Sequence, residues 1–125
     1  MKATLIIFIG SGLGGVLRYF ANFWISRWAG SEFPWGILTI NVIGSLAIGL
    51  VVASLAVRQP DNPSLALFLT TGLIGGFTTF SAFSLDTALL YERGDPLLSL
   101  TYVIASVGLS VLASLLGMWM IRSVM

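Results

Sequence analysis

The segment of residues 70–84 combines backbone and side-chain chemistry that an apolar helix does not need. Its fifteen residues include three glycines and six serines or threonines. Gly75 and Gly76 are followed closely by the β-branched pair Thr78 and Thr79, which makes a poor helix interior. Carbonyl oxygens released by a helix break at membrane depth can coordinate a cation where they line a cavity. The segment therefore predicts a broken helix; the alternative is a continuous helix whose small residues pack tightly against a neighbour.

Two pairs of side chains just after those threonines have the chemistry to contact an anion. Phe80 and Phe83 are three residues apart, as are Ser81 and Ser84, so each pair shares one face of a helix. An aromatic ring has a positive edge that can face an anion, and a hydroxyl group can donate a hydrogen bond to one. The alternative is that the two phenylalanines simply pack in a helix core.

Polar side chains also occur inside two other apolar segments. Asn41 is the only side-chain amide in residues 35–57, and it is either a hydrogen-bonding contact between helices or a donor to a passing ligand. Tyr102, Ser106, Ser110 and Ser114 recur at intervals of four and form a polar stripe along one helix face. This stripe fits either close helix packing or a track of hydroxyl donors across the membrane.

Arg18 lies in the middle of the first apolar segment. It follows Gly10, Gly14 and Gly15 within about two turns of the expected helix. A charged side chain is costly inside a bilayer, so this one is expected to reach an interface or a water-filled vestibule. A positive charge in a vestibule would attract anions.

The composition is that of an integral membrane protein. Of 125 residues, 57% are hydrophobic and 9% are charged, and the net charge is +1. An ordinary soluble domain carries about 25% charged residues, so a soluble enzyme domain, a disordered segment and a nucleic-acid-binding module are excluded. The chain has neither cysteine nor histidine, which removes thiolate metal sites, disulfides and the usual general base.

Apolar runs divide the chain into four expected membrane-spanning helices. A crossing needs roughly 20 apolar residues, because each helical residue advances about 1.5 Å through a core about 30 Å thick. Short connections rich in turn-forming and charged residues, including Pro60 and Gly94, join the runs. The expected fold is all-α, with a single transmembrane domain over residues 1–125 and spans at about 3–27, 35–57, 65–91 and 97–122.

Basic residues are distributed almost evenly between the two expected faces of the membrane. Lys2, Arg58 and Arg122 lie on the side of the termini, and Arg27 and Arg93 lie on the other side. Since an excess of lysine and arginine normally sets the orientation, this small bias predicts insertion in both orientations. Two oppositely inserted copies can form an antiparallel dimer about a two-fold axis in the membrane plane.

Three motifs together resemble the Fluc (CrcB) family of fluoride channels, over essentially the whole chain. They are Gly14-Gly15-x-x-Arg18-Tyr19, Asn41 with Gly44, and Gly75-Gly76-Phe77-Thr78-Thr79-Phe80-Ser81-x-Phe83-Ser84. The resemblance implies a non-enzymatic channel of the cell (inner) membrane that exports fluoride passively, lowers its cytoplasmic concentration and confers fluoride resistance. It also implies an antiparallel, dual-topology homodimer with two pores. The implied partners are fluoride, the lipid bilayer and a second copy of the chain, without nucleic acid or another protein.

The same resemblance implies roles for individual residues. A structural Na⁺ at the dimer interface is expected on the backbone carbonyls of Gly75 and Thr78, and Arg18 is expected near a vestibule. The hydroxyls of Ser81 and Ser84 are expected to add weak donors to the fluoride pathway. The family's pathway positions match Asn41, Phe80, Phe83, Tyr102, Ser106 and Ser110.

Three residues depart from the pattern that the family usually shows. Ile37 stands where a threonine precedes the asparagine, Ala82 stands for a serine or threonine, and Asp86 stands for a glutamate. Asp86 also bears on the main alternative, a small dual-topology proton-coupled drug antiporter, because such an exchanger needs a titratable carboxylate in the membrane. A non-conducting structural subunit is the third interpretation.

Overall fold

The structure, a computed structural model, describes residues 1–58 and 62–124 and contains helices and no strands within them. Three long α-helices are continuous: α1 (Lys2–Ala29), α2 (Trp35–Arg58) and α6 (Pro96–Val124). The chain between α2 and α6 is divided into shorter elements: α3 (Pro63–Leu67), a π-helix η1 (Phe68–Ile74), α4 (Gly75–Phe77) and α5 (Phe80–Glu92). The turn expected at Pro60 lies outside the described residues.

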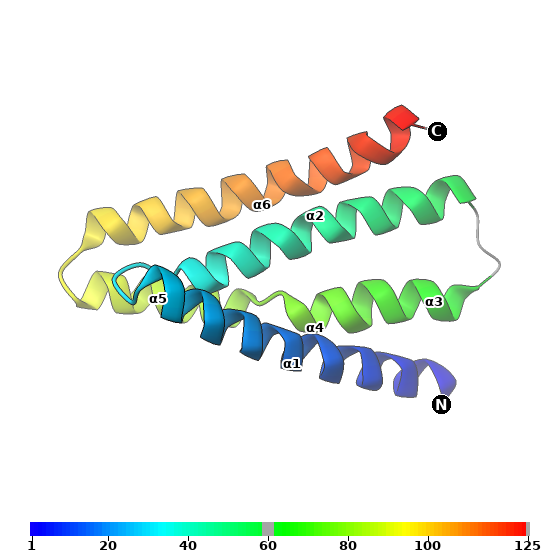
Figure 1. The fold of residues 1–125 in the computed structure, drawn as a ribbon, viewed down its shortest axis with the longest axis horizontal. Helices are drawn as coiled ribbons and strands as arrows, with labels where there is room; N and C mark the ends of the chain where they lie inside the picture. Colours follow the sequence, from blue (N-terminus) through cyan, green and yellow to red (C-terminus); the bar gives the residue numbers. More distant parts are fainter. Residues whose placement is uncertain (59–61, 125) are drawn as a thin grey trace.

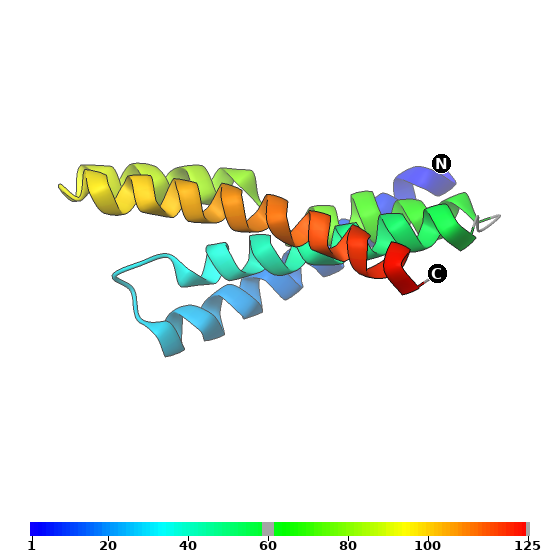
Figure 2. The same ribbon diagram turned by 90° about the horizontal axis from the view of Figure 1, so that it is seen from above.

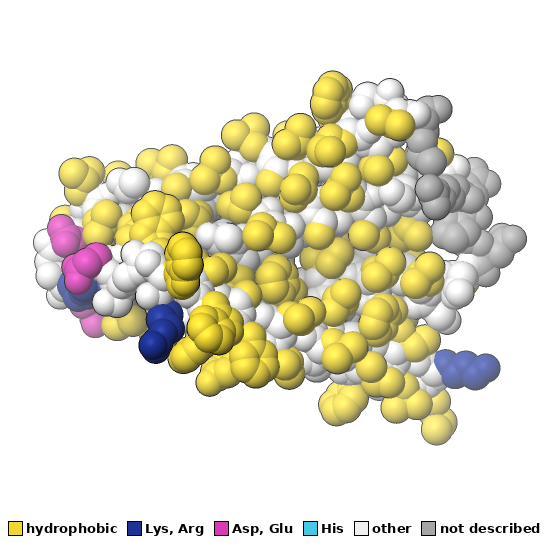
Figure 3. All heavy atoms as spheres, viewed as in Figure 1, with side chains coloured by type: hydrophobic (Ala, Val, Ile, Leu, Met, Phe, Trp, Pro, Cys, Tyr) yellow, Lys and Arg dark blue, Asp and Glu magenta, His cyan; other side chains and the backbone are white. Residues whose placement is uncertain are grey.

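The described chain has four stretches that are long and apolar enough to cross a membrane. They are α1, most of α2, the combined segment Pro63–Glu92, and α6. Both termini lie at the same end of the molecule, as an even number of crossings requires (Figure 1). Hydrophobic side chains cover the middle of the face in Figure 3, and acidic side chains gather at one end of it. The expected all-α architecture with four apolar helices is therefore confirmed.

The ends of the helices follow local signals and extend slightly past the apolar runs. The Asn62 side chain accepts a hydrogen bond from the Leu65 nitrogen at 3.2 Å, and Pro63 follows it as the first residue of α3. Proline suits this position, because the first residues of a helix have no partner for their N–H groups. At the other end of a helix, α1 stops at Gly30, whose φ of 87° is in the left-handed region that favours glycine.

Glycines allow α1 to lie close against η1 and α4. A Cβ atom at Gly10 would lie 2.8 Å from the Gly72 Cα, and one at Gly14 would lie 2.7 Å from the Phe77 nitrogen. A larger side chain at either position would separate the two elements. On the other side of the molecule, α2 packs along α6. At the end away from the termini, α5 and α6 form one layer and α1 and α2 another (Figure 2).

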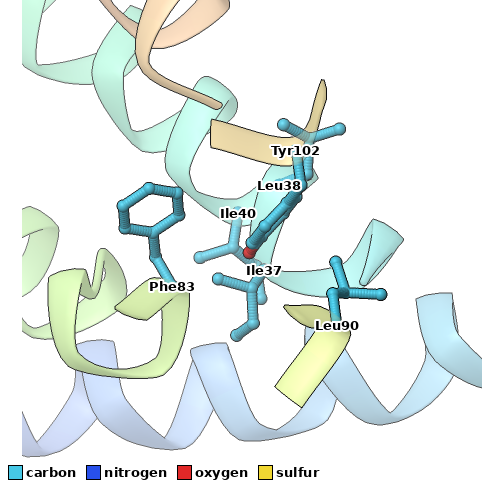
Figure 4. Packing of buried hydrophobic residues seen from close by; sticks show 6 residues of the cluster. All are labelled: Ile37, Leu38, Ile40, Phe83, Leu90 and Tyr102. Atoms are coloured by element: carbon cyan, nitrogen blue, oxygen red, sulfur yellow. The ribbon is translucent and has the colours of Figure 1, made fainter. Parts of the chain in front are cut away.

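The buried core is small and lies between α2, α5 and α6. Figure 4 shows side chains from these helices converging on one another: Ile37, Leu38, Ile40, Phe83, Leu90 and Tyr102. Many other large apolar side chains are exposed. Exposure of this extent fits helices whose outer faces contact lipid or a second chain.

Candidate functional site

The third apolar segment changes backbone conformation between α4 and α5. Thr78 has φ −78° and ψ 158°, and Thr79 has φ −153° and ψ 125°, so both residues are extended. The Thr79 side chain then accepts a hydrogen bond from the Ala82 nitrogen at 3.2 Å and caps the start of α5. Threonine suits both the extended conformation and the capping position, because its branched Cβ favours extended backbone and its hydroxyl can cap a helix.

Two side chains from other helices bind the backbone of these extended threonines. Arg18 of α1 donates from Nη1 to the Thr78 carbonyl at 3.1 Å. Asn41 of α2 accepts from the Thr79 nitrogen at 2.9 Å and donates from Nδ2 to the Thr79 carbonyl at 3.0 Å. In a continuous α-helix the Thr79 N–H would donate to the carbonyl of Gly75; here Asn41 takes that N–H, and the Gly75 carbonyl loses its helical partner.

A hollow of about 550 Å³ lies beside the extended threonines and is lined by residues of α2, η1, α4, α5 and α6. It brings together residues that are far apart in the sequence. Those among the expected site residues are Asn41, Gly75, Thr78, Phe80, Phe83, Ser106 and Ser110. The hollow is mainly apolar, so its few hydroxyl and amide groups are the polar contacts it offers to a small ligand.

Two hydroxyls at this hollow are buried without a partner among the described residues. They are the Oγ atoms of Ser106 and Ser110, which lie one turn apart on α6. A buried hydroxyl normally has a hydrogen-bond partner, because burying it unpaired costs free energy. Both groups are therefore available to donate to a ligand in the hollow.

The other expected serines have hydroxyls that interact within the protein. Ser84 donates to the Phe80 carbonyl at 2.9 Å, and the Ser81 hydroxyl lies 3.1 Å from the Thr79 hydroxyl. Neither residue is among those that line the 550 Å³ hollow. In this conformation Ser106 and Ser110 of α6 thus offer freer donors than Ser81 and Ser84 of α5.

The aromatic residues connect this hollow to a second one. The rings of Phe80 and Phe83 have centroids 5.3 Å apart, and Phe83 in turn packs on Tyr102 at 5.4 Å. The fully buried Tyr102 donates from its hydroxyl to Asp86 Oδ2 at 3.3 Å. Asp86 lines a second hollow of about 250 Å³, at the end of the helices away from the termini. Tyr102 therefore lies between the two hollows.

Ile37 and Asp86, which depart from the family pattern, both line this second hollow. Ile37 is buried and belongs to the core, so it adds apolar surface where a threonine would add a hydroxyl. Other polar groups are present there, because Asn22 and Ser26 of α1 line the same hollow. Ala82, the third departure, is partly buried and packs against the core of Figure 4.

Sequence reasoning missed the interactions of Thr79 and the partner of Arg18. The capping role of Thr79 had a local signal, since threonine is a favoured residue immediately before a helix. The bond from Arg18 to Thr78 joins residues sixty positions apart and had no such signal. It depends on the close approach of α1 at Gly14, which the sequence alone does not show.

Taken together, four apolar crossings around a mainly apolar hollow that carries a few polar groups define a multi-pass membrane protein with a site for a small ligand between its helices. Residues 5–118 match the family described as CrcB-like protein, Camphor Resistance (CrcB). The chain therefore belongs to the CrcB family.

Three curated relatives are each named Fluoride-specific ion channel FluC. The protein from Granulibacter bethesdensis is 50% identical over 123 residues, which cover 98% of this chain and 97% of the relative. The protein from Rhizobium meliloti is 44% identical over 98% of both chains. The protein from Chelativorans sp. is 44% identical over the full length of both. The similarity thus includes every helix described above.

Proposed function

We propose that this chain forms a fluoride-selective ion channel of the bacterial inner membrane, through which fluoride leaves the cytoplasm passively. The names of the relatives support the substrate and the class of activity. The observation that carries the proposal is the pair of unpartnered hydroxyls, Ser106 and Ser110, in a hollow that also contains Asn41, Phe80 and Phe83. These groups can contact an anion without covalent chemistry, in keeping with the ion-channel activity that the relatives' names give.

The donors in the hollow suit a small, strongly hydrated anion. A selective pore must replace the water around the ion with several weak contacts, which permit both entry and exit. The Ser106 and Ser110 hydroxyls provide two, and Asn41 Nδ2 keeps a second hydrogen after donating one to the Thr79 carbonyl. The positive ring edges of Phe80 and Phe83 add further weak contacts. Exclusion of larger halides would require that the path completed by a second copy be too narrow for them.

The functional unit is an antiparallel, dual-topology homodimer with two pores. One chain alone leaves Phe80 77% exposed beside a hollow that is open to the surface. A second copy on this face would cover Phe80 and complete the wall of the path. The nearly equal numbers of basic residues on the two sides support insertion of the two copies in opposite orientations.

The released carbonyls between α4 and α5 fit a structural Na⁺ at the interface of such a dimer. Carbonyl oxygens are suitable ligands for a hard cation. The Gly75 carbonyl has lost its helical partner to Asn41, and the Thr78 carbonyl retains a second lone pair beside its bond from Arg18. A single chain offers too few of these oxygens to surround a cation, so a second copy is needed. When bound, the ion would offset part of the cost of bringing an anion nearby.

Fluoride release from liposomes that contain only the purified protein tests this function. We expect rapid release, followed with a fluoride-selective electrode, that needs no proton gradient, and negligible release of chloride. Release that depends on a proton gradient would instead indicate an antiporter that uses Asp86. No release from verified dimers in Na⁺ would indicate a non-conducting subunit and contradict the proposal.

A further inference from the structure

One peptide group at the start of the extended pair is hydrogen-bonded at both of its ends. The group joins Thr78 to Thr79: its carbonyl accepts from Arg18 Nη1 at 3.1 Å, and its N–H donates to Asn41 Oδ1 at 2.9 Å. The two side chains come from α1 and α2, and they reach opposite edges of the peptide because the C=O and N–H of a trans peptide point in opposite directions. The peptide plane is therefore held between two helices.

Hydrogen bonds at both ends of a peptide group restrict its rotation in extended backbone. A peptide group outside a helix can rotate about the bonds on either side of it, which turns its carbonyl with little movement of the flanking chain. Between packed helices a lost hydrogen bond is replaced less readily than in bulk water, so the bound orientation is favoured. Bonds at both ends oppose rotation more effectively than one bond does.

The position of Arg18 on α1 explains how its side chain reaches this peptide. Gly14, one turn earlier on the same helix face, lies so close to α4 that a Cβ there would be 2.7 Å from the Phe77 nitrogen. The helix backbone is thus adjacent to the last residue of α4, and the side chain of Arg18 extends to the next residue, Thr78.

We propose that Arg18 is a positioning residue: with Asn41 it fixes the direction of the Thr78 carbonyl, and it does not act by attracting or binding the anion. The guanidinium is part-buried against backbone, and its charge-assisted bond is stronger than a neutral one. The consequence for flux rests on the proposed function, but the consequence for the peptide group does not. The two can therefore be tested separately.

The first test observes the peptide group directly by NMR. In protein labelled with ¹³C-carbonyl and ¹⁵N in threonine alone, only two peptide groups join a labelled carbonyl to a labelled nitrogen: Thr70–Thr71 and Thr78–Thr79. The first lies inside η1 and serves as an internal reference. We expect Arg18→Met to shift or broaden the Thr78–Thr79 correlation and to leave the Thr70–Thr71 correlation unchanged.

Two further variants control this test. Arg18→Lys keeps a charged donor and is expected to preserve much of the wild-type signal. Arg27→Met removes an exposed charge in the last turn of the same helix and is expected to change neither correlation. An unchanged Thr78–Thr79 correlation in Arg18→Met would overturn the proposal, whatever the effect on transport.

The second test measures fluoride flux at low and high salt. Loss of a charge-assisted hydrogen bond is expected to reduce flux in Arg18→Met about tenfold or more. Salt screens the long-range attraction between a vestibule charge and an anion, but it does not restore a missing hydrogen bond. The deficit should therefore be the same at both salt concentrations. A deficit that disappears at high salt would identify Arg18 as an anion-attracting charge and overturn the proposal.

Arg18→Gln separates donor from charge and remains informative if Arg18→Met does not fold. It keeps an N–H donor but is neutral. We expect Arg18→Gln to conduct fluoride better than Arg18→Met does. If Arg18→Met does not assemble, we expect Arg18→Gln still to form dimers and to give a recognisable Thr78–Thr79 correlation. If Arg18→Lys retained fluoride flux while Arg18→Gln and Arg18→Met lost flux equally, the charge alone would matter. That result would overturn the proposal.

Discussion

The rings of Phe80 and Phe83 are 5.3 Å apart, yet Phe83 is 8% exposed and Phe80 is 77% exposed. Phe83 packs on the buried Tyr102 and belongs to the core of the single chain. Phe80 is at the open side of the same hollow. The two aromatic residues therefore have different structural roles, although their spacing on α5 makes them look equivalent.

Substitution of each phenylalanine by isoleucine should separate these roles. We expect Phe80→Ile to cut fluoride flux with little effect on the folding of the chain. Phe83→Ile should cut flux as well, and it should also lower the free energy of unfolding by about 1 kcal/mol, because a core contact is lost. Electrode measurements of flux and thermal unfolding of the purified dimer give the two quantities. Wild-type flux in both variants would remove the rings from the pathway.

Removal of the α6 hydroxyls should affect transport without destabilising the fold. The buried Ser110 Oγ has no partner in the described structure and the Ser106 Oγ makes only a weak contact with Tyr102, so substitution by alanine breaks no well-formed internal hydrogen bond. We expect the double variant to melt at or above the wild-type temperature and to lose about tenfold in flux, equivalent to about 1.4 kcal/mol.

Ser99 provides a matched control on the same helix. Its buried hydroxyl donates to the Thr87 carbonyl at 2.8 Å and joins α6 to α5. Ser99→Ala should lower the free energy of unfolding by about 1 kcal/mol and should affect flux less than the double variant does. The opposite pattern, with flux lost only in Ser99→Ala, would show that the free hydroxyls do not serve the ion.

Two adjacent glycines on α1 should respond differently to alanine. A Cβ at Gly14 would meet the backbone of Leu73, Gly76 and Phe77, whereas a Cβ at Gly15 would meet nothing within 4 Å in the chain. Gly14→Ala should destabilise the fold by about 1–3 kcal/mol through overpacking, and Gly15→Ala should leave it unchanged. Thermal unfolding of both variants tests this difference, and equal stability would argue against the close approach of α1 to α4.

Orientation can be tested by adding charge. Two or three lysines added to the loop of residues 30–34 should retain that loop on the cytoplasmic side and lock one topology. Lysines added at the termini should lock the opposite one. We expect each locked population alone to lose flux and a co-expressed mixture to regain it, since only the mixture can form antiparallel dimers. Full activity in a verified single-topology population would contradict the antiparallel arrangement.

The fold was largely predictable, because its main determinant is the length and position of apolar runs. The ends of the helices were less predictable. The third crossing was predicted to start at about residue 65, but it starts at Pro63, because the Asn62 cap and the proline set its first residue. Of the polar residues predicted for the pathway, Asn41, Ser106 and Ser110 line the hollow, whereas Ser81, Ser84 and Tyr102 do not.

What could not be predicted depends on contacts between helices. The partner of Arg18 is set by how closely α1 approaches α4, whereas the sequence predicted only that this charge would reach an interface or a water-filled vestibule. The different exposure of Phe80 and Phe83 likewise follows from packing on Tyr102. Sequence spacing puts both rings on one helix face but does not show what covers each.

The most direct measurement for the central claim is the reversal potential of purified dimers in a planar bilayer, with both fluoride and chloride on both sides, concentration gradients of the two ions in opposite directions, and equal pH. The account predicts current that reverses close to the equilibrium potential for fluoride, as expected if chloride does not pass. Current that reverses near the chloride potential, or that requires a pH gradient, would contradict a passive fluoride-selective pore.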